Sequence, residues 1–346
     1  MKKLLTVLVV LLVLVGCGSG NGDKPVLRVY NWGEYIDEDV IYAFEEEFGV
    51  RVQYDNFFSN EDMYTRIASE SYDVLVPSDY MIQRLVEEDK LMELDYSKIP
   101  NAENVDAEYR NRHFDVDNKY SVPYFVGSVG LVYNKTVISE ADIENQGWDI
   151  LRNTDYTDRI FFYNSERDAF MIALKSLGYS MNTADENELQ EAYEWLVAMK
   201  QEVNPVYVDD YVIDAMEVGE KDIAVMYSGD ATYVLSMNDE LGYIEPKQGT
   251  NVWIDAMVIP KDAPNADLAH AFMNFILEPE NQEAISIEVG YTSPISSVAQ
   301  SVGSKEYEGI EAYFPRTGFA LDEEFYYNAE TKVILGDLWN KLIAAN

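Results

Sequence analysis

Residues 27–36, LRVYNWGEYI, contain the first strand expected in this chain and the turn that follows it. The apolar residues at 27, 29 and 30 are typical of a short buried strand, and Gly33 ends it. Acidic residues 37–39 then open an amphipathic helix. A strand followed at once by a helix is the repeating unit of an α/β sheet, so this stretch sets the fold class that we expect.

Trp32, Glu34 and Tyr35 lie at the turn between that strand and that helix. In an open α/β sheet, ligands bind beyond the carboxyl ends of the strands. An aromatic face and a carboxylate side by side suit a cation, because one offers a negative quadrupole and the other a full charge. The alternative is that Trp32 packs under the turn and Glu34 is solvated, and this stretch alone does not separate the two.

The same alternation of strand and helix continues toward the middle of the chain. Residues 37–48 carry one apolar helical face, and residues 50–54 alternate as in a half-buried strand. A capping box, Ser59 with Asp62, begins a helix that runs to about residue 68. Residues 72–76 predict a buried strand and residues 79–88 the next helix. Repeated units of this kind predict a mostly parallel sheet with helices on both faces.

Two extended stretches interrupt the alternation, at residues 120–133 and 251–260. Neither leaves room for a helix, and between them strands are predicted at 159–163 and 223–227, with a helix at 167–177. We interpret the extended stretches as crossings from one part of the molecule to another.

Aromatic and acidic residues recur at the predicted strand ends. Ser78, Asp79 and Tyr80 follow one strand at the start of a helix. Helix capping explains Ser78 and Asp79 adequately, but it does not explain Tyr80. The same combination returns farther along the chain, in Asp168, Tyr227 and Asp230.

Trp253 and Asp255 lie in the second crossing, two residues apart, so on a strand they share one face. An acid inside an otherwise apolar run is costly unless it has a partner. Of the acids considered, Asp255 is therefore the one that capping explains least. Tyr291 follows the predicted helix 279–289 and completes the set of candidate ligand-binding residues.

Composition narrows the possible partners. The 346 residues are 47% hydrophobic, which is enough for two domains with real cores. The 63 acidic residues outnumber the 25 basic ones, giving a net charge of −38. Such a chain repels nucleic acid and anionic membranes and attracts cationic ligands. With one cysteine, Cys17, and two histidines, His113 and His270, it has little material for a metal site or for Ser/His/Asp catalysis.

The amino terminus predicts export. Residues 1–15 have a basic start and an apolar run too short to span a bilayer, as in a signal peptide. Residues 14–17, LVGC, resemble the bacterial lipobox, which implies cleavage before Cys17 and lipidation of its thiol. We therefore expect a signal peptide at 1–16, a lipidated tether at 17–25, and a protein anchored in the cell membrane on the extracytoplasmic face. A plain secretory signal is the alternative.

Taken jointly, these residues resemble the spermidine/putrescine-binding lipoproteins of bacterial polyamine ABC importers. The resemblance is carried by YNWGEYI (30–36), YDVLVPSDYMI (72–82), LGYS (177–180), WIDAMVIP (253–260) and VGYTSP (289–294). It implies a two-lobe periplasmic-binding-protein-like α/β fold, in which each lobe is a mostly parallel sheet flanked by helices and extended strands join the lobes. Lobe 1 would comprise residues 26–124 with 255–296, and lobe 2 residues 125–254 with 297–346.

The resemblance also implies the amine-binding positions. They carry over at Trp32, Glu34, Tyr35, Ser78, Tyr80, Asp168, Trp253, Asp255 and Tyr291, and Asp79, Tyr227 and Asp230 join them as candidates. Gly33, Ser165 and Tyr227 depart from the spermidine-preferring type, which has threonine, aspartate and tryptophan there. Asp230 is instead similar to the putrescine-preferring type. The departures leave the preferred amine open.

We therefore expect a monomeric solute-binding lipoprotein that captures a polyamine, spermidine or putrescine, and delivers it to ABC transporter permease subunits. We expect no cofactor, no metal, no nucleic-acid partner and no catalysis. A binding protein for a sugar or another small solute remains an alternative, since Trp and Asp also bind hydroxyls. A glycoside hydrolase using paired carboxylates is a further one.

Overall fold

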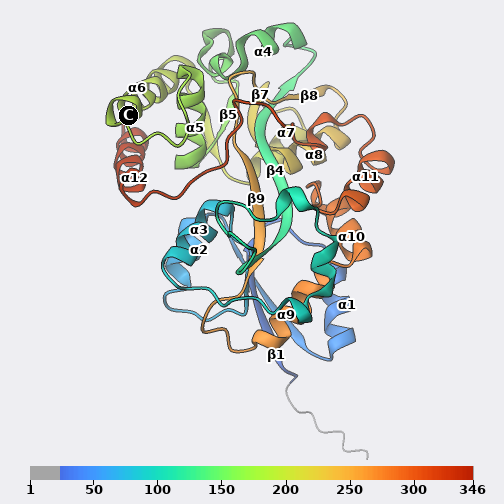
Figure 1. The fold of residues 1–346 in the computed structure, drawn as a ribbon. Helices are drawn as coiled ribbons and strands as arrows, with labels where there is room; N and C mark the ends of the chain where they lie inside the picture. Colours follow the sequence, from blue (N-terminus) through green and yellow to red (C-terminus); the bar gives the residue numbers. More distant parts are fainter. Residues whose placement is uncertain (1–23, 346) are drawn as a thin grey trace, which may run out of the picture.

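The computed structural model describes residues 24–345. The predicted signal peptide, residues 1–16, and Cys17 lie outside the described residues, as does all of the predicted tether except its last two positions. The fold is mixed α/β, with two groups of helices packed around a shared sheet (Figure 1). The predicted fold class and two-lobe arrangement are confirmed by this architecture and by its structural relatives, described below.

The amino-terminal lobe is built on parallel strands β1 (Val26–Trp32), β2 (Arg51–Phe57) and β3 (Val74–Leu75). Helix α1 (Glu38–Phe48) begins where the Asp37 carboxylate accepts a hydrogen bond from the Asp39 amide, and it ends at Gly49 with φ 65°. Helices α2 (Asn60–Arg66) and α3 (Asp79–Glu87) complete the β-α units. The capping bond predicted between Ser59 and the Asp62 amide is present at 3.1 Å.

The second lobe repeats this plan. Strands β5 (Ile160–Tyr163), β6 (Val206–Val208) and β7 (Ile223–Tyr227) are parallel to one another. The helices of this lobe are α4 (Glu140–Gln146), α5 (Glu166–Leu177), α6 (Glu186–Val203), α7 (Tyr211–Glu217) and α8 (Ser228–Met237). Residues 168–175 of α5 are all buried, and only two residues separate β5 from α5, so the first turn of α5 lies near the end of β5.

Two long antiparallel strands connect the lobes, β4 (Ser121–Asn134) and β9 (Val252–Val258). Strand β4 pairs with β9 over residues 121–128, and then with β7 and β8 (Leu241–Ile244). The described strands thus form one nine-stranded sheet, in the order β2-β1-β3-β9-β4-β7-β5-β6 with β8 on β4. The outer strands are parallel, as expected, whereas the crossing strands are antiparallel to their neighbours (Figure 1).

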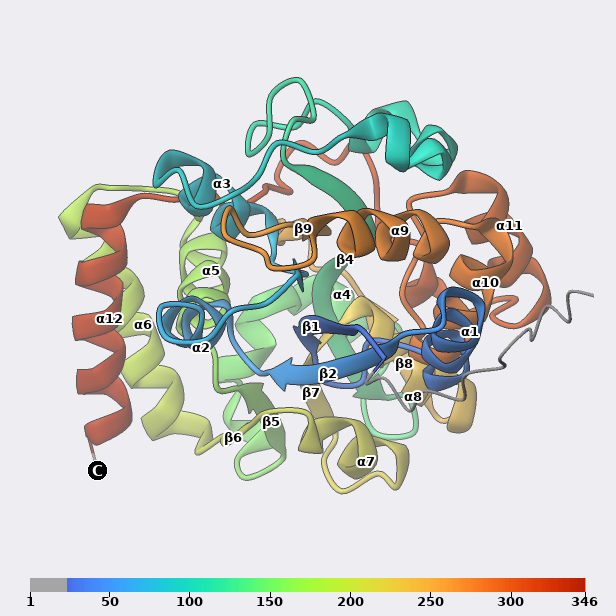
Figure 2. The ribbon, with the colours of Figure 1, turned by 90° about the horizontal axis from the view of Figure 1, so that it is seen from below.

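The carboxyl-terminal third contributes helices to both lobes. Helices α9 (Ala266–Ile276) and α10 (Pro279–Val289) lie beside α1, where Phe44 packs edge-on against Phe272 at 5.1 Å (Figure 2). Helix α11 (Ser296–Lys305) packs on α10, and α12 (Ala329–Ala344) packs on α5 and α6. The sequence analysis did not predict α7, α11, β6 or β8, and β6 and β8, with three and four residues, are too short to show an apolar period.

Residues 101–119 form an irregular segment that precedes β4. Short 3₁₀ turns occupy part of this segment, Pro100–Asn104 and Ala107–Tyr109. Asp115 is buried and accepts hydrogen bonds from the amides of Lys119, Tyr120 and Ser121. It therefore stabilises a turn from inside the fold, which a local reading of the sequence could not reveal.

The segment before α12 is tied to both lobes. The Glu323 carbonyl accepts a hydrogen bond from the Val252 amide at 2.9 Å, and the Glu323 carboxylate pairs with the buried ammonium of Lys175 in α5. The neighbouring Glu324 carboxylate pairs with His113 at 2.9 Å. These contacts fasten the chain across the opening between the lobes.

We expect Lys175→Ala to lower the free energy of unfolding by about 3 kcal/mol, because it leaves the Glu323 carboxylate without its cation in a partly buried position. Urea denaturation of the purified variant measures this change. The matched control is Lys305→Ala, whose exposed pair with Glu283 should contribute less than about 1 kcal/mol. Equal effects of the two variants would contradict the role assigned to Lys175.

Candidate ligand-binding site

The fold brings the predicted site residues toward one region between the lobes. They come from six separate places in the chain: the β1–α1 turn, the start of α3, the first turn of α5, the β7–α8 junction, strand β9, and the residue pair after α10. Each place except β9 is a strand end or a helix end, and β9 crosses between the lobes beside them. The sheet order therefore explains why these distant segments meet.

Aromatic rings form the connected wall of this region. The Tyr291 ring lies 5.0 Å from Tyr35, at right angles, and 5.5 Å from Trp253. Tyr227 packs edge-on against Trp253 at 6.4 Å and stacks on Tyr163 at 4.4 Å. Rings from both lobes and from the crossing strand thus share one surface.

Asp255 lies beside this wall and is only 5% exposed. Its Oδ1 atom is buried without a hydrogen-bond partner, and so is the nearby Tyr35 hydroxyl. Burial raises the pKa of Asp255 to about 7, although the Ser78 and Tyr35 hydroxyls oppose the shift. An acceptor of this kind is available to a ligand that donates hydrogen bonds and carries positive charge.

Asp230, which is partly buried, is the second acceptor. It accepts hydrogen bonds from the hydroxyls of Tyr291 at 2.8 Å and Tyr163 at 3.0 Å. Burial raises its pKa to about 7 as well. Asp168, in α5, accepts a bond from the Tyr227 hydroxyl at 2.7 Å, and burial raises its pKa.

The start of α3 differs from the capping arrangement that we expected. The Ser78 side chain makes no capping bond and instead accepts from the Asn60 amide at 3.1 Å. Asp79 is fully buried, its Oδ2 atom has no partner, and burial raises its pKa. Tyr80 is 7% exposed and its hydroxyl accepts from Asn60 at 3.1 Å. Capping therefore does not account for Ser78, whereas the Asp79 Oδ1 atom accepts a hydrogen bond from the Tyr80 amide at 2.6 Å, at the start of the helix.

Trp32 and Glu34 lie at the edge of the region. Trp32 packs against Phe57 at 4.5 Å, as in the packing alternative, but its indole nitrogen is buried without a partner. Glu34 is exposed in a left-handed conformation, φ 45°. It lines a cavity of about 370 Å³ together with acids from the other lobe, among them Asp210, Asp214 and Asp230. The opening toward the buried carboxylates is therefore acidic.

Sequence reasoning missed several residues that shape the site. Tyr163 was assigned only to a strand, yet its hydroxyl holds Asp230. A Cβ on Gly229 would lie 2.1 Å from the Tyr291 ring, and one on Gly127 would lie 2.3 Å from Trp253. These glycines are needed because the two rings lie flat against the backbone there. Gly229 lies in the sequence YSGD (227–230), but nothing in the neighbouring sequence indicates that the Tyr291 ring packs against it.

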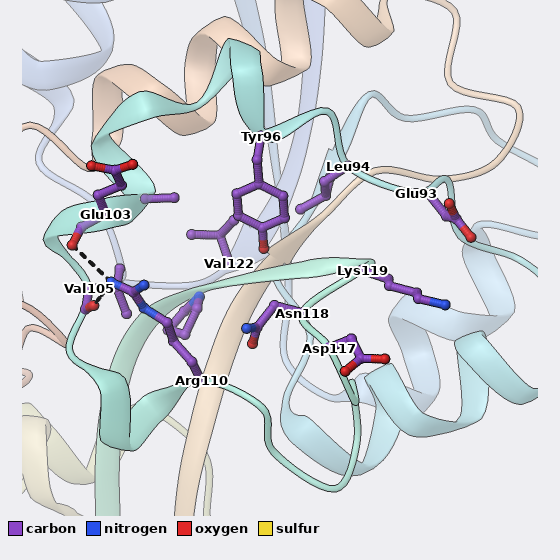
Figure 3. Close-up of a pocket in the computed structure, with 12 residues that line it drawn as sticks. Glu93, Leu94, Tyr96, Glu103, Val105, Arg110, Asp117, Asn118, Lys119 and Val122 are labelled. Carbon is purple, nitrogen blue, oxygen red and sulfur yellow. Dashed lines mark hydrogen bonds between the residues drawn. The ribbon is translucent and has the colours of Figure 1, made fainter.

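A second cavity, of about 380 Å³, lies on the amino-terminal lobe (Figure 3). Tyr96, Asn118 and Arg110 line it, and Figure 3 shows the Arg110 side chain directed at the backbone near Val105. None of the predicted site residues borders this cavity. Among residues 24–345, no group of His, Cys, Asp and Glu side chains is arranged to hold a metal ion.

Comparison with known proteins identifies the family. The sequence profile described as bacterial extracellular solute-binding protein matches residues 39–312. The spermidine/putrescine-binding periplasmic protein of Salmonella typhimurium is 31% identical over 296 residues, which cover 85% of this chain and 84% of the relative.

Solved structures agree with that match. A candidate spermidine/putrescine ABC transporter protein from Listeria monocytogenes superposes with a TM-score of 0.85 at 35% identity, over 93% of this chain and 99% of the other. The spermidine/putrescine ABC transporter substrate-binding protein of Streptococcus pneumoniae gives 0.77 at 36% identity, over 92% and 99%. Both similarities extend over nearly the whole chain.

We expect Asp255→Asn to stabilise the ligand-free protein at pH 8. Because the folded-state pKa of about 7 lies above the ordinary value of 3.8, the folded protein binds this proton more tightly than the unfolded chain does. Ionisation between about pH 4 and pH 7 therefore destabilises the fold, by about 1.4 kcal/mol per pKa unit. Thermal melts should show a larger gain at pH 8 than at pH 5.

The matched control is Asp267→Asn, which changes an exposed carboxylate paired with Lys98. This control should bring no gain in stability at either pH. A melting temperature of Asp255→Asn that is unchanged or lower at pH 8 would show that the Asp255 carboxylate has a partner in the free protein.

Proposed function

This chain belongs to the bacterial extracellular solute-binding protein family, and from that premise we propose that its ligand is a polyamine, spermidine or putrescine, held between the two lobes. One observation carries the proposal. Asp255 and Asp79 are buried, Asp230 is partly buried beside Tyr163 and Tyr291, and within residues 24–345 no Lys or Arg nitrogen lies within 4.0 Å of their carboxylates. Buried carboxylates that lack a cation from the chain are suited to ammonium groups of a ligand.

The aromatic rings suit the rest of such a ligand. Polyamines consist of methylene chains between ammonium groups, so they need apolar walls as well as charge. Trp253, Tyr291 and Tyr35 supply such walls next to Asp255, and their faces also attract cations. The names of the relatives support the same ligand class. A neutral sugar would leave the buried carboxylates without positive charge.

We propose that lobe 1 comprises residues 26–124 with 255–296 and lobe 2 residues 125–254 with 297–346. The antiparallel pairing of β4 with β9 supports crossings close to these boundaries. In this arrangement Asp255 and Asp79 belong to lobe 1, and Asp230 and Asp168 to lobe 2. A ligand that bridges them would hold the lobes together.

The remaining steps of this role are binding and delivery rather than catalysis. The relatives are solute-binding proteins, and we propose that this chain likewise acts as a monomer that presents its ligand to ABC transporter permease subunits. The relative from Salmonella typhimurium is named a periplasmic protein, which fits an extracytoplasmic location. None of the helices in residues 24–345 has the length and apolar character needed to cross a membrane.

Isothermal titration calorimetry of the purified chain tests the function. Putrescine, cadaverine, spermidine and spermine are the amine arms, and maltose is the neutral arm. We expect amine binding that weakens with added salt. Asp255→Asn should reduce amine affinity at least about 30-fold, because losing one partner of a buried charge pair costs about 2–5 kcal/mol.

Two outcomes would contradict the proposal. One is binding of maltose, insensitive to salt, with no amine binding. The other is amine affinity of folded Asp255→Asn within about threefold of wild type, which would remove Asp255 from the site. Thermal melts establish that the variant is folded, and Asp267→Asn controls for the change of an exposed acid.

The membrane anchor is a separate proposal, since Cys17 lies outside the described residues. The motif LVGC at 14–17 supports lipidation of Cys17 after cleavage of residues 1–16. We expect Cys17→Ala to leave the protein unlabelled by a radioactive fatty acid and to shift it out of the membrane fraction. Unchanged labelling and membrane retention would exclude this anchor.

A further inference from the structure

The Tyr163 hydroxyl makes two hydrogen bonds inside the second lobe. It donates to Oδ2 of Asp230 at 3.0 Å, and it accepts from the Tyr227 amide at 3.1 Å. The buried Tyr163 ring also stacks on the Tyr227 ring, with 4.4 Å between their centres. A tyrosine hydroxyl has one proton, and a backbone amide can only donate. The proton of Tyr163 is therefore directed at the Asp230 carboxylate.

The other oxygen of Asp230 receives its hydrogen bond from the opposite lobe. Its Oδ1 atom accepts from the Tyr291 hydroxyl at 2.8 Å. In the proposed division Tyr291 belongs to lobe 1, whereas Tyr163 and Asp230 both belong to lobe 2, where β5, β7 and α8 lie together (Figure 1). Movement of the lobes apart would take Tyr291 away from Asp230 and leave Tyr163 in place. Tyr163 is thus the donor that Asp230 keeps while a ligand enters.

The other titratable side chains that face Asp230 do not replace this donor. The Tyr227 hydroxyl donates instead to Asp168. Apart from the Tyr233 hydroxyl, the titratable groups that line the cavity with Asp230 are acids from three other elements: Glu34, Asp210, Asp214 and Glu288. Within residues 24–345, no Lys or Arg nitrogen lies within 4.0 Å of the Asp230 carboxylate. Burial raises the pKa of Asp230 to about 7, and the charges of Asp210 and Glu34 act in the same direction, whereas the tyrosine hydroxyls oppose the rise.

We propose that Tyr163 is a positioning residue that holds the Asp230 carboxylate ionised and oriented toward the ligand, and thereby sets the pH range over which the site captures a cationic ligand. This inference rests on the proposed polyamine function and concerns the regulation of the same site. A hydroxyl that donates to a carboxylate favours the charged form of that carboxylate. A cation binds well only to the charged form, so a protonated Asp230 must lose its proton before it can pair with an ammonium group.

Calorimetry at pH 6 and pH 8 with wild type and Tyr163→Phe tests this role. The ligand is putrescine or, if it binds more tightly, spermidine, whose primary ammonium groups stay charged at both pH values because such groups titrate at about pH 10. Tyr163→Phe keeps the ring and removes the donor. It should lower affinity about tenfold at pH 6 but less than about threefold at pH 8, because the variant carboxyl is protonated in more molecules at the lower pH.

Two further variants show whether the effect passes through Asp230. Tyr207→Phe is the matched control, because the Tyr207 hydroxyl, in the neighbouring strand β6, is buried without a hydrogen-bond partner. It should leave affinity unchanged at both pH values. In an Asp230→Asn background no carboxyl remains at this position. Addition of Tyr163→Phe there should produce no difference between the two pH values, since effects that share one group do not add.

The pH dependence separates positioning from a merely structural role. A loss of affinity in Tyr163→Phe that is equal at pH 6 and pH 8 would overturn the inference, as would a pH-dependent loss that persists in Asp230→Asn. Unchanged affinity of Tyr163→Phe at both pH values would overturn it too, and would leave the polyamine function intact. Binding of no amine by the wild type would overturn that function and this inference with it. Thermal melts of each variant at both pH values establish that a folded protein is titrated.

Discussion

The burial of carboxylates without a cation from the chain is the constraint on which the rest of the site depends. Removing a charged group from water is costly unless a partner replaces the water. The hydroxyls of Tyr163 and Tyr291 donate hydrogen bonds to Asp230 and so replace part of its hydration, whereas one carboxylate oxygen of Asp255 has no hydrogen-bond partner. Removal from water also raises the pKa of both carboxyl groups, because it disfavours their charged form. A positively charged ligand supplies the missing partner. The free energy that burial of these carboxylates takes from the ligand-free fold therefore favours binding of such a ligand.

The paired crossing strands fix the position of Asp255 in the sheet. Asp255 lies on β9, which is bonded on one side to β4 and on the other to β3. The sheet also brings the start of α3 to Asp255, through a backbone bridge between Ser78 and Asp255. Glycines at 127 and 229 let Trp253 and Tyr291 lie against the backbone, so the rings stand close enough to form one wall. The buried carboxylates thus support the proposed cationic ligand class, and the packed aromatic rings support apolar segments between the charges of the ligand.

Charged residues are distributed unevenly within this acidic chain. The net charge of −38 draws cations toward the molecule as a whole, and acids such as Glu34 and Asp210 surround the opening. Arg167 and Lys332 lie within 4.0 Å of Glu61, whereas within residues 24–345 no Lys or Arg nitrogen lies that close to the carboxylates of Asp255, Asp79 or Asp230. The long-range field therefore favours cations in general.

The sequence by itself determined the strand-and-helix alternation, the two crossings and the places where aromatic and acidic residues follow strand ends, because periodicity and capping are local properties. It also marked Asp255, since an acid within an apolar run stands out without any knowledge of the fold. Only the tertiary structure decided that Asp79 is buried rather than a solvated cap, that Tyr163 holds Asp230, and that Arg167 stacks on Tyr80. These features arise from contacts between segments far apart in the chain. Short elements such as β6 and β8 were missed for the same reason: their neighbours in the sheet stabilise them, and their own sequences do not.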